Sequence, residues 1–237
     1  MTEFDYPELS LKSVDLAPSD PQFRRASTAP RELLSDRLHF GGPVAVPIGT
    51  NDVDVDTDLV AFIRGEAATA RYVLVHSALT FHSDPGDPEF ESAEVLMDLS
   101  DETGTLEVIA WSLLPQSAAM PFETSRGFAL GPSLKLSGVD LTVGSVDGTT
   151  TRHGHDVFLR AIDELTSHAG WKFQRTPTVE LDGSYRLVMI VRASALGKAQ
   201  LSVTLAATVR ASGLRPRRFR SVLPLGGVEG PSSKLEF

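Results

Sequence analysis

Hydrophobic and polar residues alternate along several stretches of the chain, which is the pattern of β-strands with one buried face. The strictest alternation runs through residues 200–210, where every second residue is apolar. Residues 71–81 are rich in strand-forming residues and apolar on both faces, as expected for a central strand. After short turn sequences, residues 89–99 and 105–114 show further strand patterns. These three neighbouring strands predict an antiparallel meander in the first half of the chain.

A second group of strand patterns covers residues 171–210. The segment Trp171–Phe173 leads to residues 178–181, and Asp182-Gly183 is a strong signal for a two-residue hairpin turn. Residues 185–191 then alternate again, ahead of the strand at 200–210. We therefore predict a second antiparallel meander.

One segment between the two groups has helical spacing. Apolar residues at the intervals of a single helical stripe are Val157, Phe158, Ala161, Ile162 and Leu165. Asp156 and Arg160 form an i,i+4 pair on the polar side, and Gly170 suits the position after a helix end. The spacing predicts a helix over about 154–168.

Together these elements favour a mainly β fold, a two-layer antiparallel β-sandwich built from two meanders with one packed α-helix. The alternative is two small α+β halves that separate near residue 150. Residues 1–34 are rich in proline and polar residues, which predicts a flexible N-terminal arm, although alternating Leu11 and nearby apolar residues could add to a sheet edge. Residues 35–223 form the β-rich domain in this interpretation, and residues 224–237 form a tail.

Charge is distributed unevenly along the chain. Residues 1–150 hold 24 acidic and 9 basic residues, whereas residues 151–237 hold 7 acidic and 13 basic residues, for a total of −9. Either both halves fold together and their charges offset one another, or one half presents a surface to a charged partner. The chain has no cysteine, no apolar run long enough for a membrane span and no apolar segment near its acidic N-terminus. We therefore expect a cytoplasmic protein without a membrane span.

Two groups of residues are candidate metal ligands. The acidic ladder consists of Asp52, Asp54, Asp56 and Asp58. Its spacing is similar to the start of a calcium-binding EF-hand loop, but Thr57 and Ile63 stand where that loop needs glycine and glutamate. Two interpretations of these carboxylates stay open: a calcium site of looser geometry, or a loop that is simply exposed to solvent.

His153 and His155 are the second candidate, because two histidines before a helix can bind zinc or nickel. Val157 and Phe158 replace the Asp and His that would complete a metallohydrolase H-x-H-x-D-H sequence. The alternative is a solvated segment without metal.

A basic cluster is the sharpest local feature, and its residues are Arg215, Arg217, Arg218, Phe219 and Arg220. Arginines beside an aromatic ring could bind phosphate or stack on a base. The acidic pI of about 5.1 argues against nucleic acid. An acidic surface of a partner protein, or the chain's own acidic half, suits this cluster better.

The chain lacks a phosphate-binding loop, a serine-nucleophile elbow and a dinucleotide fingerprint. We therefore expect a non-catalytic cytosolic module that binds or assembles with a protein, another copy of itself included, through a sheet edge or charged surface, without a cofactor. The alternative is a metal-dependent enzyme or metal-binding protein that uses His153, His155 and nearby carboxylates with a divalent metal.

Overall fold

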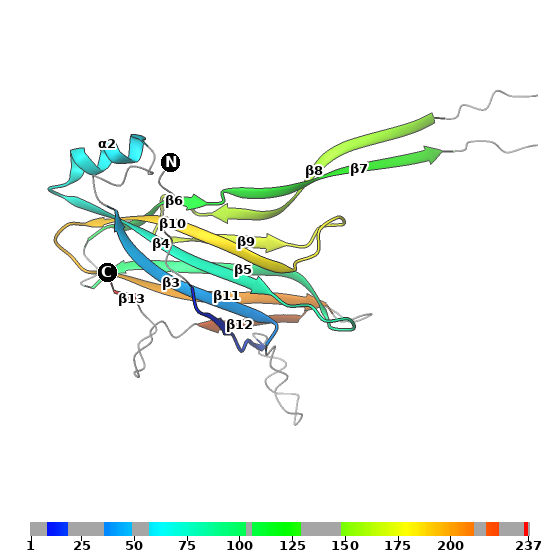
Figure 1. The fold of residues 1–237 in the computed structure, drawn as a ribbon, viewed down its shortest axis with the longest axis horizontal. Coiled ribbons are helices and arrows are strands. Elements are labelled where there is room, and N and C mark those ends of the chain that lie inside the picture. The colour runs from blue at the N-terminus through cyan, green and yellow to red at the C-terminus, as the bar shows by residue number, and fades with distance from the viewer. Residues whose placement is uncertain are drawn as a thin grey trace, which may run out of the picture.

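The computed structural model is a two-layer β-sandwich made of two antiparallel sheets (Figure 1). It describes residues 9–18, 36–48, 57–102, 106–128, 148–210, 217–222 and 235–236. The five-stranded sheet contains, in spatial order, β1 (Leu11–Ser13), β3 (Leu38–Ile48), β4 (Ala70–Phe81), β10 (Gly183–Ser194) and β6 (Val108–Leu114). The eight-stranded sheet runs through β2 (Ala17–Pro18), β12 (Arg217–Val222), β11 (Ala199–Arg210), β5 (Glu89–Asp101), β9 (His168–Gln174), β8 (Gly148–Ile162) and β7 (Ser117–Phe128), with β13 (Leu235–Glu236) paired to β11. The predicted mainly β, two-layer antiparallel sandwich is confirmed.

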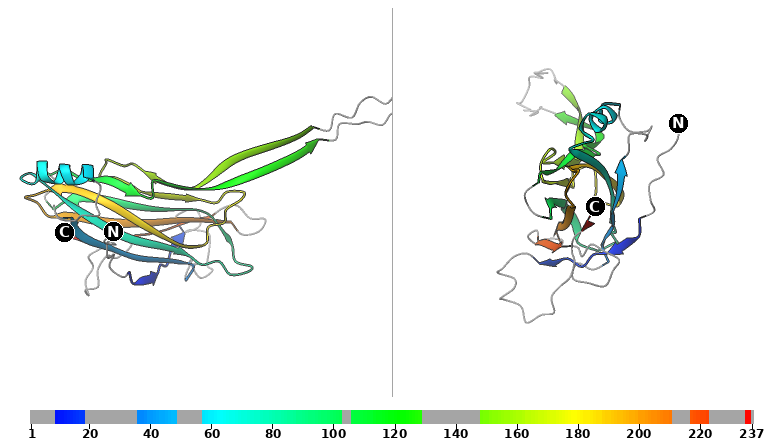
Figure 2. Two further views of the ribbon diagram at one scale, coloured as in Figure 1. Left: turned by 45° about the horizontal axis from the view of Figure 1, so that its top comes forward. Right: turned by 90° about the vertical axis from the view of Figure 1, so that its left-hand side faces the viewer.

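The core fills the space between the two sheets, which the end-on view shows as two layers (Figure 2). Strand β4 lies between β3 and β10 and is buried along almost its whole length, as its two apolar faces predicted. The largest core side chains are aromatic. Phe81 on β4 packs edge-on against Phe90 on β5 at 5.1 Å and against Phe173 on β9 at 5.5 Å, which ties the two sheets together.

The strands are connected differently from the two predicted meanders. Strand β4 belongs to the five-stranded sheet, β5 to the eight-stranded sheet, and β6 to the five-stranded sheet again. Strands β9, β10 and β11 alternate between the sheets in the same way. The meanders are therefore wrong, because an alternating pattern shows which face of a strand is buried but not which of two facing sheets holds it. The Asp182-Gly183 turn crosses between the sheets instead of closing a hairpin.

The alternative of two halves split near residue 150 is also wrong. Strand β10 from the second half lies between β4 and β6 from the first half, and β5 lies between β11 and β9. Each sheet therefore depends on strands from both halves.

The helix predicted over about 154–168 is wrong. Residues up to Ile162 continue β8, and β9 begins at His168. Ala118 pairs with Leu159 and Ala119 pairs with Val157, so Phe158 is the extra residue of a β-bulge. Consecutive apolar residues at this bulge imitate helical spacing, whereas the fully buried Leu159 lies outside the predicted stripe.

Gly170 does not end a helix. It lies in β9 opposite Leu96 of β5. A Cβ atom at this position would lie 2.0 Å from the carbonyl oxygen of Val95, so the absence of a side chain lets the two strands approach.

Within the described residues the helix is α2 (Thr57–Glu66), which packs on the outside of β4 (Figure 1). The sequence showed only a short apolar run at Leu59–Ile63, which is too short to distinguish a helix from a strand. No helix in the part of the chain that the structure describes is long and apolar enough to cross a membrane.

Part of the predicted N-terminal arm is built into the sandwich. Strand β1 pairs with β3, and β2 pairs with β12. Between them, Val14 is 5% exposed and Leu16 is fully buried in the core. Residues 11–18 therefore join both sheets, as the alternation at Leu11 allowed. Of the predicted tail, residues 235–236 pair with β11.

Candidate functional site

A two-stranded ribbon projects from the sandwich (Figure 1). We define the ribbon as β7 together with residues 148–158 of β8. Strand β7 pairs with β8 from Ser117–Arg160 to Phe128–Gly148. Strand β9 pairs with β8 only from Leu159 to Ile162. Among the described strands, the ribbon therefore has an open edge on β7 and a second open edge on β8 from Gly148 to Phe158.

The root of the ribbon is anchored by the bulge. Leu159 is fully buried, and the ring of Phe158 lies 5.9 Å from that of Tyr185 on β10. Burial, and to a smaller extent the charge of Asp182, raise the pKa of Tyr185. Thr178 Oγ1 donates a hydrogen bond of 2.7 Å to Asp156 Oδ2, which links β8 to the loop after β9. The structure therefore fixes the ribbon where it leaves the sandwich.

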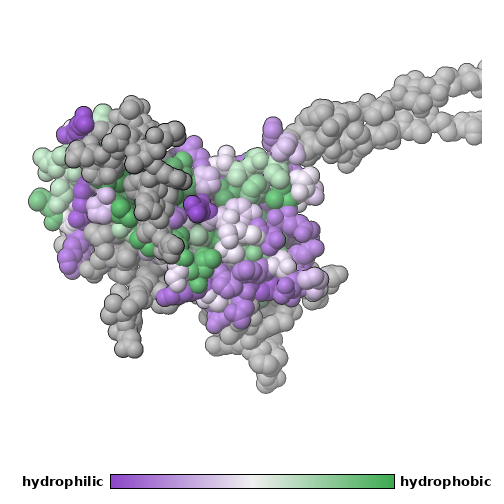
Figure 3. Space-filling model, viewed as in Figure 1, coloured by the Kyte–Doolittle hydropathy of each residue, from purple (hydrophilic) through white to green (hydrophobic). Residues whose placement is uncertain are grey.

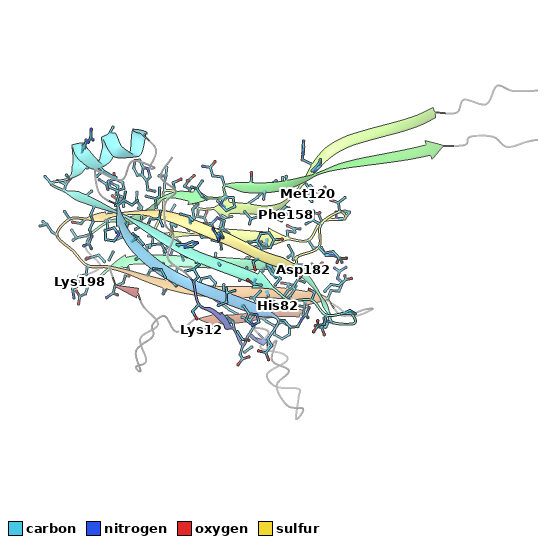
Figure 4. All side chains as sticks on the ribbon, in the orientation of Figure 1. Lys12, His82, Met120, Phe158, Asp182 and Lys198 are labelled. Atoms are coloured by element: carbon cyan, nitrogen blue, oxygen red, sulfur yellow. The ribbon has the colours of Figure 1, made fainter. Side chains whose placement is uncertain are left out.

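Exposed apolar surface lies beside this root (Figure 3). Met120 on β7 is 52% exposed, and Leu114 at the end of β6 is exposed to the same extent. Figure 4 shows Met120 where the ribbon leaves the sandwich, with Phe158 on the neighbouring strand. A partner that pairs with the ribbon near its root would find apolar side chains to cover.

Ion pairs between the two halves of the chain cross the outer face of the eight-stranded sheet. Glu94 on β5 accepts a hydrogen bond of 2.6 Å from Arg218 on β12 and lies 3.8 Å from Lys172 on β9. Arg210 on β11 pairs with Glu91 on β5. The acidic residues come from the first half and the basic residues from the second. This agrees with the interpretation that both halves fold together and their charges offset one another.

An open cleft of about 300 Å³ lies where β5 begins and β9 and β11 end. Its lining includes Arg175 and Arg210, which pair with Glu89 and Glu91. Arg175 also reaches Glu180 at 3.2 Å. Because each guanidinium already faces a carboxylate, the cleft has little excess charge to attract an ion.

The structure divides the predicted basic cluster. Arg218 and Arg220 are exposed on the outer face of the eight-stranded sheet. Phe219 is only 4% exposed and belongs to the core, so its ring does not share the outer surface with these two arginines. Its neighbours alternate outward because successive residues of a strand point to opposite faces. The partner-binding role of the cluster stays a prediction. Arg217 lies at the start of β12, and Arg215 lies outside the described residues.

The candidate metal ligands do not come together in the described part of the chain. His153 and His155 are both on β8 instead of before a helix, at positions opposite Glu123 and Pro121. His155 is exposed. Asp58 lies in α2, and the other carboxylates of the ladder, Asp52, Asp54 and Asp56, lie outside the described residues. The described residues contain no group of three or more His, Cys, Asp or Glu side chains that could hold a metal.

The ribbon itself was not predicted. The predicted helix covered residues 154–158 of its second strand and continued beyond it. Val157, Leu159 and Ala161 nevertheless alternate along the chain, with Phe158 and Ile162 as the apolar residues that interrupt the polar positions. That alternation was the signal for a strand, and the bulged Phe158 obscured it. The projection beyond β9 has no sequence signal, because it depends on where a neighbouring strand ends.

No family model matches the chain, and no curated protein matches it. Among solved structures, Clostridium perfringens delta-toxin is similar over 97% of this chain and 86% of that chain, with 9% sequence identity and a TM-score of 0.30. A likeness this weak supports no conclusion about the present protein.

Proposed function

We propose that this protein is a non-catalytic binding or assembly module that takes up an extended segment of a partner protein at an open edge of its ribbon. An open edge presents unpaired backbone N–H and C=O groups, to which an extended chain can add as a further strand. The observation that supports this function is the pairing pattern. The pairing of β9 with β8 ends at Leu159 of β8, whereas the pairing of β7 with β8 continues to Phe128 and Gly148.

The other long edges are better protected. At β6, the N–H of Ala110 donates to the carbonyl oxygen of Thr166 at 2.9 Å, and the N–H of Leu113 donates to Glu164 Oε1 at 3.0 Å. At β3, Pro47 removes a backbone donor beyond the end of β1. Proline and covering loops are common means of preventing edge pairing. Their contrast with the ribbon favours the ribbon as the binding edge.

The two edges of the ribbon are not equivalent. Strand β7 contains Pro121, which cannot donate a backbone hydrogen bond, whereas residues 148–158 of β8 contain no proline. Three consecutive threonines at 149–151 also favour an extended conformation. The edge of β8 is therefore the better acceptor for an added strand.

Two shortened chains test this function. In the tip-deleted variant, Asn-Gly replaces residues 129–147 and joins Phe128 to Gly148, which are cross-strand partners. In the ribbon-deleted variant, Asn-Gly replaces residues 121–155 and joins Met120 to Asp156, which are also partners. The second variant keeps the hydrogen bond between Asp156 and Thr178 that anchors the root.

The probes are ten-residue peptides selected from a random displayed library on the full chain, then synthesised with a fluorescent label. We expect equal binding, measured by fluorescence anisotropy, to the full chain and the tip-deleted variant, and no binding to the ribbon-deleted variant. Two methylated forms of each peptide are then compared, one methylated at the odd-numbered and one at the even-numbered backbone nitrogens. Only one of the two forms should lose binding, because only one set of N–H groups faces β8. Unchanged binding to the ribbon-deleted variant, or unchanged binding of both methylated forms, would contradict the proposal.

The metal-dependent alternative stays a prediction. His153 and His155 occupy alternate positions along β8. No further observation in the described residues favours it.

A further inference from the structure

A second hydrophobic cluster lies outside the sandwich, on the outer face of the five-stranded sheet. Its buried members are Ile48, Ile63, Ala70, Tyr72 and Leu74, and the partly buried Trp111, Val188 and Ile190 pack against them. Ile63 belongs to α2, and the others belong to strands β3, β4, β6 and β10. Helix α2 therefore covers an apolar face that is separate from the main core.

The end of α2 is fastened to two strands through one carboxylate. Glu66 Oε2 accepts a hydrogen bond of 2.9 Å from the hydroxyl of Tyr72 on β4 and one of 2.7 Å from Arg192 Nε on β10. The side chains of Glu66 and Arg192 are 32% and 24% exposed, so solvent and other molecules can reach this contact. The ring of Tyr72 also packs edge-on against Trp111 at 5.8 Å.

The charges around Glu66 keep this contact formed at neutral pH. Hydrogen bonds from Arg192 first, and from Tyr72 second, hold the pKa of Glu66 below its ordinary value of 4.5. Burial and the hydrogen bond to Glu66 raise the pKa of Tyr72, so its hydroxyl remains a donor. Among the described residues, Glu107 is a second acidic group beside this arginine, 4.0 Å from Arg192 Nη1 and 74% exposed. The Glu66 carboxylate is therefore ionised at neutral pH and takes up its proton at a lower pH than an ordinary glutamate does.

We propose that α2 is a lid over this apolar face and that Glu66 is its latch. When Glu66 loses Tyr72 and Arg192, the helix detaches and the face that contains Trp111 becomes exposed, while the sandwich stays folded. The main core supports this separation, because it is a distinct cluster formed between the two sheets. The device does not depend on the ribbon.

Glu66→Ala in the full chain is the test, because alanine keeps the helix propensity of α2 while removing the latch. Glu107→Ala is the matched control, since it removes the other carboxylate beside Arg192. Each is made with Trp171→Phe, so that the remaining Trp111 reports on the face, and separately with Trp111→Phe, so that the fully buried Trp171 reports on the core. Tyr72→Phe keeps the ring and removes only the hydroxyl donor.

We expect Glu66→Ala to increase acrylamide quenching of Trp111 and to leave that of Trp171 unchanged. Amides of α2 should exchange at least about tenfold faster, the factor expected when a charge-assisted hydrogen bond is lost. Glu107→Ala should change neither signal, and Tyr72→Phe should give an intermediate effect. In the Trp171→Phe protein that keeps Glu66, acrylamide quenching of Trp111 should stay constant from pH 8 to pH 5. It should rise only below pH 4.5, the ordinary pKa of a glutamate, because the pKa of Glu66 is lowered.

Two results would overturn the lid. Equal quenching of Trp111 in Glu66→Ala and Glu107→Ala would show that Glu66 does not hold the helix. A parallel rise in quenching of Trp171 would show general loosening of the protein instead of detachment of one helix.

Discussion

Replacing Leu16 by alanine tests whether the N-terminal segment is a working part of the sandwich. Leu16 is fully buried between β1 and β2, and the N–H of its neighbour Val14 donates to the carbonyl oxygen of Leu38 at 2.9 Å. Loss of three carbon atoms removes about 2.4 kcal/mol of transfer free energy at roughly 0.8 kcal/mol each. A cavity adds to this loss, so we expect a decrease of about 2.7–5 kcal/mol in the free energy of unfolding.

Urea denaturation measures this decrease as a lower midpoint with an unchanged m value. For a chain of this size the melting temperature should fall by about 5–20 °C. Leu11→Ala is the control, because Leu11 is 46% exposed on β1 and its loss should change stability by no more than about 0.5 kcal/mol. If the two variants are equally stable, residues 11–18 do not belong to the folded unit and the reasoning fails.

Two further predictions concern the sheets. Gly170→Ala should destabilise the protein by at least about 1–3 kcal/mol, because the new Cβ would meet the carbonyl oxygen of Val95. Gly65→Ala is the control and should not destabilise the protein, because a Cβ at that position has open space. The midpoints of urea denaturation measure the difference between the two variants. Burial first, and the charge of Arg186 second, lower the pKa of His76, so NMR titration should place its midpoint below 6.5. The unfolded state then binds the proton more readily than the folded state. The contribution of His76 to stability should therefore be complete above pH 6.5 and decrease as the pH falls towards the folded-state pKa. A midpoint at or above 6.5 would contradict the burial of His76.

The sequence by itself determined where most strands of the sandwich lie and which of their faces are buried. The alternation over residues 200–210 and the doubly apolar 71–81 correspond to β11 and β4. These features are local, because a strand's two faces differ in solvent exposure within a few residues. The opposite net charges of the two halves left open whether the halves fold together or one of them faces a charged partner. The pairs of Glu94 with Arg218 and Lys172 agree with the first interpretation.

The ribbon, whose open edge we propose as the binding site for a partner, could not be derived from the sequence for a different reason. Phe158 broke the alternation of β8 by occupying a bulge, and a bulge is defined only by the strand opposite it. Phe219 likewise looked like an exposed aromatic within a basic cluster. Its burial depends on β12 placing that one side chain inward against the core while its arginine neighbours face outward.

Only the tertiary structure decided which sheet each strand joins, where α2 lies and how far the ribbon projects. The inner faces of the two sheets bury the same kinds of side chains, so a strand pattern cannot tell them apart. An edge becomes open or covered according to where a neighbouring strand ends, and β9 stops at Leu159 of β8 through contacts between segments that sequence patterns treat separately. The same holds for the Glu66 latch, whose donors Tyr72 and Arg192 meet it from two different strands because pairing of β4 with β10 brings them together.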